Sequence, residues 1–205
     1  AGSVRCGSET ATSLPVILYD IPGRTGVAIG YDTFHRAAKH PNIVAVKDAK
    51  GDLAQVSRLM LETGLMYFSG DDSYALPQLS VGATGLIGVT ANIAPHAYRE
   101  MLDATNANDF HAALKVHNAL EPLQRAVMNH VPGTVAAKYV LHGLGLIGSP
   151  RVRLPLVGPE DSEAAEIESG IDQVQSVPGL SFDNFRPDRN AAAGGALPKV
   201  AGTTR

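Results

Sequence analysis

The sequence predicts an α/β protein in which a parallel sheet is followed by a region of helices alone. Between residues 14 and 94, short apolar runs bounded by proline or glycine alternate with stretches of helical periodicity through four units. From residue 95 onward the apolar pattern is helical only. Such alternation implies parallel strands joined by crossovers, and it leaves two architectures open: a doubly wound sheet or part of a (β/α)8 barrel.

Each predicted strand is an almost wholly apolar run, as expected for a strand whose two faces are both buried. The four runs cover residues 15–21, 43–47, 65–69 and 85–89. Between them, helices are predicted over about 31–39, from an N-cap at Asp52, and around Leu76 and Leu79. Later helices are predicted over about 95–104, 108–128 and 134–144, and the segment 146–174 favours a further one.

Composition excludes several classes of protein. The 205 residues are 44% hydrophobic and 18% charged, with a net charge of -3, so nothing calls for a nucleic-acid or anionic-membrane partner. No apolar run approaches the roughly 20 residues that span a bilayer. Because Cys6 is the sole cysteine, no disulfide can form within the chain, which fits a reducing, cytoplasmic compartment. The seven histidines are scattered without metal-ligand spacing, and no metal is expected.

Lys47 is the first candidate for chemistry, because it ends the apolar strand 43–47. Reactive groups of parallel α/β folds gather where strands end at their carboxyl edge. Apolar neighbours around a lysine stem disfavour the ammonium form, and the neutral amine can add to a ketone to form an imine. From position alone, the more common case is a lysine that leaves the strand into solvent with its stem along the sheet.

Tyr19 and Arg24 are predicted to emerge at the same edge as Lys47, one strand away. A phenol can relay protons, and a guanidinium can hold a carboxylate through two parallel hydrogen bonds. The glycine-containing stretches 70–72 and 85–92 also lie at strand ends, where the backbone can approach a ligand closely. Taken singly, Tyr19 and Arg24 are better explained as a packed tyrosine and a surface arginine, and the two glycine-containing stretches are explained at least as well by plain turns and helix caps.

Taken in order, five segments resemble the dihydrodipicolinate synthase family of Schiff-base-forming (class I), pyruvate-dependent aldolases. They are PVILYDIPGRTG at 15–26, NIVAVKDAKGD at 42–52, YFSGDD at 67–72, LIGVTAN at 86–92 and RLPL at 153–156. The resemblance covers residues from about 14 to about 174. It implies a (β/α)8 TIM barrel of which this chain holds about the second half, as four βα units over 14–94 and a C-terminal helical region over 95–175.

The resemblance also implies a reaction and a role for each candidate residue. Lys47 would form the Schiff base with pyruvate, Tyr19 would be the proton-relay phenol, and Arg24 would hold the carboxylate of aspartate semialdehyde. The main-chain carbonyls of Gly70 and Ile87 would line the site. The implied lyase reaction gives 4-hydroxy-tetrahydrodipicolinate in lysine and diaminopimelate biosynthesis, with no metal or organic cofactor. Intact members are homo-oligomers, namely tetramers, and the loop around Arg24 favours this branch over the sialic-acid lyases.

The sequence departs from the family pattern at several places. Asp20 stands where asparagine is common. The family's Gly-Thr-Thr-Gly-Glu loop, which binds the pyruvate carboxylate and supplies a threonine to the relay, has no counterpart here. Neither does the tyrosine that a neighbouring subunit provides. The lead 1–13 and the tail 176–205 match nothing in the family and are expected to be disordered or, for the lead, foreign to the fold.

We therefore expect a truncated or frame-disrupted product, also because the chain lacks an initiator methionine, with little or no synthase activity on its own. Two alternatives stay open. One is a non-catalytic half-barrel remnant that pairs with itself or with another chain to cover its sheet edges. The other is a related class I aldolase that uses a different aldehyde.

Overall fold

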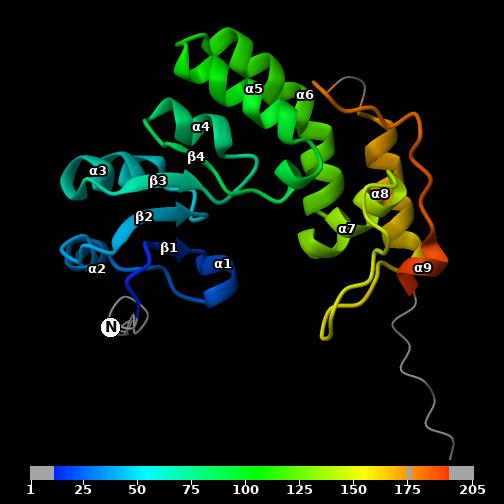
Figure 1. Ribbon diagram of the computed structural model, residues 1–205, viewed down its shortest axis with the longest axis horizontal. Helices are drawn as coiled ribbons and strands as arrows, with labels where there is room; N and C mark the ends of the chain where they lie inside the picture. The colour runs from blue at the N-terminus through cyan, green and yellow to red at the C-terminus, as the bar shows by residue number, and fades with distance from the viewer. Residues whose placement is uncertain (1–11, 175–176, 194–205) are drawn as a thin grey trace, which may run out of the picture. The chain divides into compact units, whose positions relative to one another are not determined.

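The structure, a computed structural model, describes residues 12–174 and 177–193 (Figure 1). The chain forms two compact units. The first, called here the sheet unit, runs to Ala91 and includes Tyr98–Asn118. The second, called the helical unit, comprises Asn92–Ala97 and the chain from Ala119 onward. This division differs from the predicted boundary between residues 94 and 95, because the hydroxyl of Tyr98 hydrogen-bonds to Thr90 and joins the following helix to the sheet unit.

The sheet unit is built on four strands, which are β1 (Val16–Asp20), β2 (Ile43–Asp48), β3 (Met66–Ser69) and β4 (Gly85–Leu86). Neighbouring strands pair in parallel in the order β1-β2-β3-β4, so the predicted parallel sheet is confirmed. β4 is shorter than the predicted 85–89, because the backbone N–H groups of Val89 and Thr90 donate to the Asp72 carboxylate instead of to a strand.

The helices that follow these strands in the sheet unit are α1 (Pro22–Thr25), α2 (Tyr31–Ala37), α3 (Leu53–Thr63) and α4 (Ala75–Ser80). The predicted cap of α3 is confirmed, since the Asp52 side chain accepts the Gln55 N–H at 3.0 Å. Figure 1 shows α2 and α3 along one side of the sheet. The apolar cluster on that side includes Phe34, Val56, Leu59, Ile43, Val46 and Tyr67.

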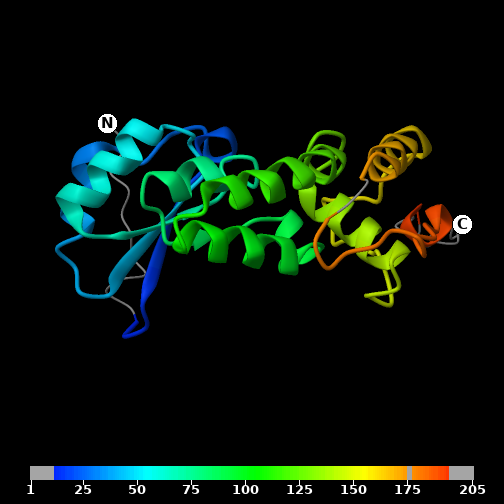
Figure 2. The same ribbon diagram turned by 90° about the horizontal axis from the view of Figure 1, so that it is seen from above.

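A short 3-10 turn, η1 (Thr90–Asn92), leads into the long helices α5 (Pro95–Asn106) and α6 (Phe110–Met128). Figures 1 and 2 both show α5 beside the first part of α6, so the two form a hairpin. Its turn passes through Asn108 in the left-handed region, with φ at 60°. Within the described residues, no helix has the length and apolar character needed to cross a membrane.

The helical unit continues with α7 (Gly133–Gly143), α8 (Asp161–Asp172) and α9 (Arg189–Ala193). α8 covers only part of the segment 146–174, and it begins at a capping box made by Glu160 and Glu163. The backbones of α6 and α8 approach closely, since a Cβ added to Gly170 would lie 2.6 Å from that of Ala126. The apolar core of this unit includes Leu120, Leu123, Val127, Val135, Val140, Ile167 and Ile171.

Residues 177–193, within the tail for which disorder was predicted, make specific contacts in the structure. Phe185 packs so closely on Gly143 that a Cβ there would overlap its ring. Arg189 pairs with Glu168, and Gly179 lies against His96. These contacts reach segments far away in the sequence, so the local proline and glycine content could not indicate them. Residues 1–11 of the predicted lead 1–13, and residues 176 and 194–205 of the predicted tail 176–205, lie outside the described residues.

Candidate active site

Lys47 and Tyr19 lie side by side at the carboxyl edge of the sheet. They are register partners on β2 and β1, and each is one residue before the end of its strand. The Lys47 Nζ lies 4.1 Å from the centroid of the Tyr19 ring, which is a cation–π arrangement. Tyr19 is 42% exposed and Lys47 is partly buried. A small molecule can therefore reach an amine and a phenol at one point.

Gly70 gives the Lys47 side chain its room. A Cβ on Gly70 would lie 3.0 Å from both Cγ and Cε of Lys47 and 3.1 Å from the Cβ of Ala49. The Gly70 N–H donates to the Asp48 carbonyl at 2.7 Å, which fixes the backbone at this place. A larger residue at position 70 would push the lysine stem away, so glycine keeps the end of β3 against it.

Ile87 directly follows β4 at the same edge. Its N–H donates to the Ser69 carbonyl at 2.8 Å, which extends the pairing of β3 and β4 by one residue. Because Ser69 and Leu86 are register partners, Ile87 is placed beside Gly70. The structure thus brings together four of the five predicted site residues: Lys47, Tyr19, Gly70 and Ile87.

Arg24 stands apart from this group on α1, which begins directly after β1. The helix closes at Gly26, whose N–H donates to the Pro22 carbonyl and whose φ is 75°. Arg24 is exposed, and in the described part of the chain its guanidinium has no hydrogen-bond or ion-pair partner. The sequence predicted a loop around Arg24. Proline at the first helical position was the signal for a helix.

The polar side chains buried near the site include Asp20, Asp48, Tyr67 and Gln78. Asp20 and Asp48 are register partners at the ends of β1 and β2. Asp20 accepts the Ile29 N–H at 3.0 Å, and Gln78 donates to Asp48 at 2.8 Å. Among the described residues, Asp20 Oδ2, Tyr67 Oη and Gln78 Oε1 are buried without a hydrogen-bond partner.

These surroundings change the acidity of two of the four groups. Burial raises the pKa of the Asp48 carboxyl, and the charge of Asp20 raises it further. Burial also raises the pKa of the Tyr67 hydroxyl, and the charges of Asp48 and Asp20 add to that effect. From the sequence, Asp20 was noted only as an aspartate where asparagine is common. Two aspartates at the last positions of adjacent strands were the missed signal.

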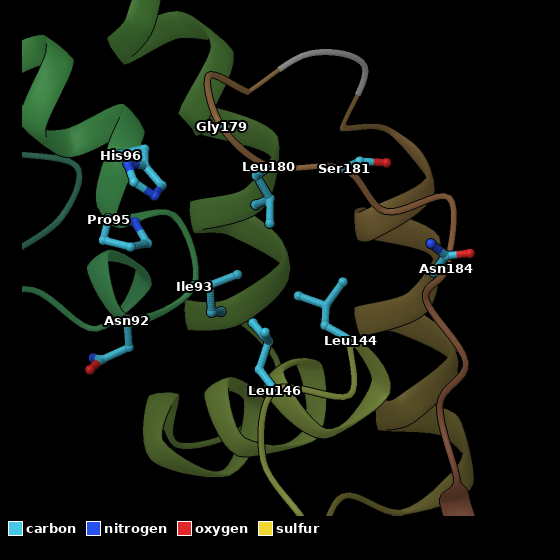
Figure 3. Close-up of a pocket in the computed structure, with 10 residues that line it drawn as sticks. All are labelled: Asn92, Ile93, Pro95, His96, Leu144, Leu146, Gly179, Leu180, Ser181 and Asn184. Carbon is cyan, nitrogen blue, oxygen red and sulfur yellow. The ribbon is translucent and has the colours of Figure 1, made fainter.

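A separate cavity of about 400 Å³ lies in the helical unit (Figure 3). Figure 3 shows the side chains of Ile93, Leu144, Leu146 and Leu180 pointing toward one another across it. His96 and Asn184 are among its other lining residues, and none of the predicted site residues lines it. Among residues 12–174 and 177–193, no group of three or more His, Cys, Asp or Glu side chains is arranged to hold a metal ion.

Comparison with known proteins gives one consistent result. Residues 9–174 match the family described as the dihydrodipicolinate synthetase family. The chain is 42% identical over 160 residues to a 4-hydroxy-tetrahydrodipicolinate synthase of Kineococcus radiotolerans, covering 78% of this chain and 52% of that protein. It is 45% identical over 157 residues to the synthase of the same name from Mycobacterium leprae, covering 76% and 52%.

A solved structure is similar over the same part of the chain. It is the chloride-inhibited dihydrodipicolinate synthase from Acinetobacter baumannii complexed with pyruvate. The two structures superpose with a TM-score of 0.73 and 36% sequence identity, over 80% of this chain and 56% of that one. The chain thus spans about half the length of the curated relatives that it matches.

Proposed function

Because the chain belongs to the dihydrodipicolinate synthetase family, we propose that Lys47 forms a Schiff base with pyruvate as the first step of 4-hydroxy-tetrahydrodipicolinate synthesis. The membership confirms the family predicted from the five segments, and it implies an α/β fold of the TIM-barrel class. One observation of the site carries the proposal: the Lys47 amine lies over the Tyr19 ring. Gly70 supports this arrangement, because its lack of a side chain lets the end of β3 lie against the Lys47 side chain.

In the proposed reaction, the neutral Lys47 amine adds to the ketone carbon of pyruvate and forms a carbinolamine. The Tyr19 hydroxyl gives a proton to the carbinolamine oxygen, which leaves as water while the imine forms. Loss of a proton from the methyl carbon then gives an enamine, whose carbon attacks the aldehyde of aspartate semialdehyde. The carbonyl oxygens of Gly70 and Ile87 would accept hydrogen bonds from the N–H and O–H groups that appear along this path.

Arg24 is proposed to hold the carboxylate of aspartate semialdehyde. Its guanidinium is exposed and, within the described residues, unpaired, as expected of a group that waits for an anionic substrate. A panel of aldehydes tested with wild type and Arg24→Ala would measure this role. Loss of selectivity for the carboxylate-bearing aldehyde supports it, and unchanged selectivity favours a class I aldolase with another substrate.

We also propose that the four strands are the second half of a (β/α)8 barrel. The sheet face opposite the α2 and α3 cluster carries the exposed side chains Ile17 (45%), Tyr19 (42%) and Met66 (45%), as expected of a barrel wall that faces its interior. The other half would supply the loop that binds the pyruvate carboxylate. The active form is proposed to be a cytoplasmic homo-oligomer, tetrameric as in the family resemblance, which light scattering would measure.

The proposed Schiff base can be tested by trapping. The chain is incubated with pyruvate, reduced with borohydride and weighed by intact mass spectrometry. We expect a reduced adduct on wild type and none on Lys47→Ala. Lys50→Ala is the matched control and should keep the adduct, because its amine is engaged by Gln55. A folded wild type that gives no adduct would contradict the proposal and favour a non-catalytic half-barrel.

A further inference from the structure

We propose that Asp72 is a positioning residue of the keto-acid site, which holds the loop after β4 so that the Ile87 carbonyl faces the site beside Lys47. The inference rests on the proposed function. It concerns a side chain that would never touch the substrate and would act only through the backbone of residues 87–90.

The Asp72 carboxylate is buried and accepts hydrogen bonds from the loop after β4. It is 2% exposed. Its Oδ2 accepts the Val89 N–H at 2.9 Å, and its Oδ1 accepts the Thr90 N–H at 3.2 Å. The Thr90 hydroxyl donates to the same Oδ1 at 2.7 Å. Hydrogen bonds to an ionised acceptor are among the stronger ones in proteins, so these three donors tie the loop to one carboxylate.

Gly88 shows how closely the carboxylate approaches the loop. A Cβ added there would overlap Asp72 Oδ1 and lie 2.8 Å from Asp72 Cγ. Position 88 therefore has no space for a side chain, and the peptide that follows Ile87 lies directly against the carboxylate.

The Ile87 carbonyl belongs to a peptide held on both sides. Before it, the Ile87 N–H donates to the Ser69 carbonyl at 2.8 Å. After it, the Val89 N–H donates to Asp72. Because the flanking peptides are fixed, the direction of this carbonyl is fixed as well. Asp72 also lies two residues beyond Gly70. The turn that contains Asp72 therefore influences both carbonyls proposed to line the site, those of Gly70 and Ile87.

Two buried hydroxyl groups form a chain of hydrogen bonds that ends on the Asp72 carboxylate. The Thr90 hydroxyl gives its single proton to Asp72, so the Tyr98 hydroxyl must donate to the Thr90 oxygen. Thr90 is 0% exposed and Tyr98 is 3% exposed. An amide at position 72 has the size of the carboxylate, but its NH2 group would face one of these donors and could not accept from it. Asp72→Asn is therefore the discriminating variant.

The expected kinetic effect follows from when the Ile87 carbonyl is used. It would accept a hydrogen bond from the carbinolamine, which appears only after the amine has attacked the ketone. A misplaced carbonyl should therefore lower the limiting rate of imine formation and leave the pyruvate concentration for half-maximal rate nearly unchanged. A general loosening of the site would raise that concentration as well.

The test compares Asp72→Asn with the control Asp71→Asn in the full chain. Asp71 is the neighbouring aspartate, is exposed, and its side chain accepts from Ser73 alone among the described residues. Borohydride trapping of the pyruvate imine is followed against pyruvate concentration. For Asp72→Asn we expect the limiting rate to fall at least about tenfold and the half-saturating pyruvate to change less than about twofold. Asp71→Asn should match wild type.

Several results would overturn the proposal. An unchanged limiting rate in Asp72→Asn would do so, as would an equal loss in Asp71→Asn. If Asp72→Asn fails to fold, Thr90→Val decides, because it removes one donor and keeps both backbone hydrogen bonds. It should lower the limiting rate about threefold, and an unchanged rate counts against the proposal.

Failure of the proposed function is separately visible, because the wild type would then give no adduct. In that case, amide hydrogen exchange at Val89 and Thr90 would test whether Asp72 fixes the loop after β4. Faster exchange in Asp72→Asn than in Asp71→Asn supports it, and equal exchange overturns it.

Discussion

The sheet unit and the helical unit each contain a shielded carboxylate, but its surroundings are opposite in the two. In the sheet unit, Asp48 stands beside a second aspartate, Asp20, and burial raises the pKa of the Asp48 carboxyl. In the helical unit, Glu168 accepts hydrogen bonds from Arg189 at 3.0 Å and from Tyr139. The hydrogen bond from Arg189 is the main cause that lowers the pKa of the Glu168 carboxyl.

The difference shows where each unit places polar groups. The edge of the sheet gathers an amine, a phenol and two aspartates, and it leaves three buried oxygens without partners among the described residues. Such an arrangement costs stability and is typical of functional sites. In the helical unit, Glu168 on α8 forms an ion pair with Arg189 on α9, and this pair holds the two helices together. We therefore expect changes at the sheet edge to alter chemistry or to relieve this cost in stability, and changes in the helical unit to lower stability.

Tyr19→Phe should have the largest effect. The ring and its contact with Lys47 remain, but the proton donor is lost, so the rate of imine formation should fall by about a hundredfold. Thermal unfolding should be unchanged, because Tyr19 is 42% exposed. The control is Tyr74→Phe, another exposed tyrosine of the sheet unit, which should match wild type. If the rate does not fall in Tyr19→Phe, the Tyr19 hydroxyl is not the proton donor of the proposed reaction.

Gly143→Ala should destabilise the helical unit by about 2 kcal/mol, since the added methyl group overlaps the Phe185 ring. Chemical denaturation measures the loss. Gly148→Ala is the control, because a Cβ at that position would meet nothing within 4 Å. Equal stability of the two variants would mean that residues 177–193 do not pack on α7.

Glu168→Gln should destabilise the helical unit by about 1 kcal/mol at neutral pH, a value that allows for the 42% exposure of the Arg189 side chain. Because folding lowers the pKa of Glu168, its contribution is present above the pKa of the unfolded state and is lost as the pH falls through the folded value. Denaturation curves of the variant and wild type should therefore converge in acid. A difference that persists in acid would point to packing instead of charge.

Asp20→Asn should stabilise the sheet unit by about 1 kcal/mol at neutral pH, because it removes one of two adjacent buried charges. Since folding raises the pKa of Asp48, its contribution is present below the unfolded pKa and is lost as the pH rises through the folded value. The advantage of Asn should therefore shrink as the pH falls toward 4. Thermal unfolding at two pH values measures this, with the exposed Asp32→Asn as control.

The features that the sequence predicted correctly depend on neighbours along the chain. Alternating apolar runs indicate the strands, Asp52 caps its own helix, and strand ends place Lys47 and Tyr19 at one edge. All three follow from local periodicity and from the rule that parallel strands end together.

The features that were missed join segments distant in sequence. Asp72 accepts hydrogen bonds from residues 17 and 18 positions further along the chain. Asp20 lies opposite Asp48 on the neighbouring strand, and Phe185 packs on Gly143. No local pattern encodes such contacts. A buried aspartate and an exposed one look alike in a sequence, as Asp72 and Asp71 demonstrate.

The most direct test of the central claim is to find which lysine carries the reduced pyruvate adduct, by peptide mapping of the trapped wild-type chain. The account predicts modification at Lys47, whose amine lies over Tyr19, and none at Lys50, three residues further along the chain. An adduct at Lys50, or one spread over several lysines, would contradict the proposal that pyruvate reacts with the one amine that lies beside Tyr19.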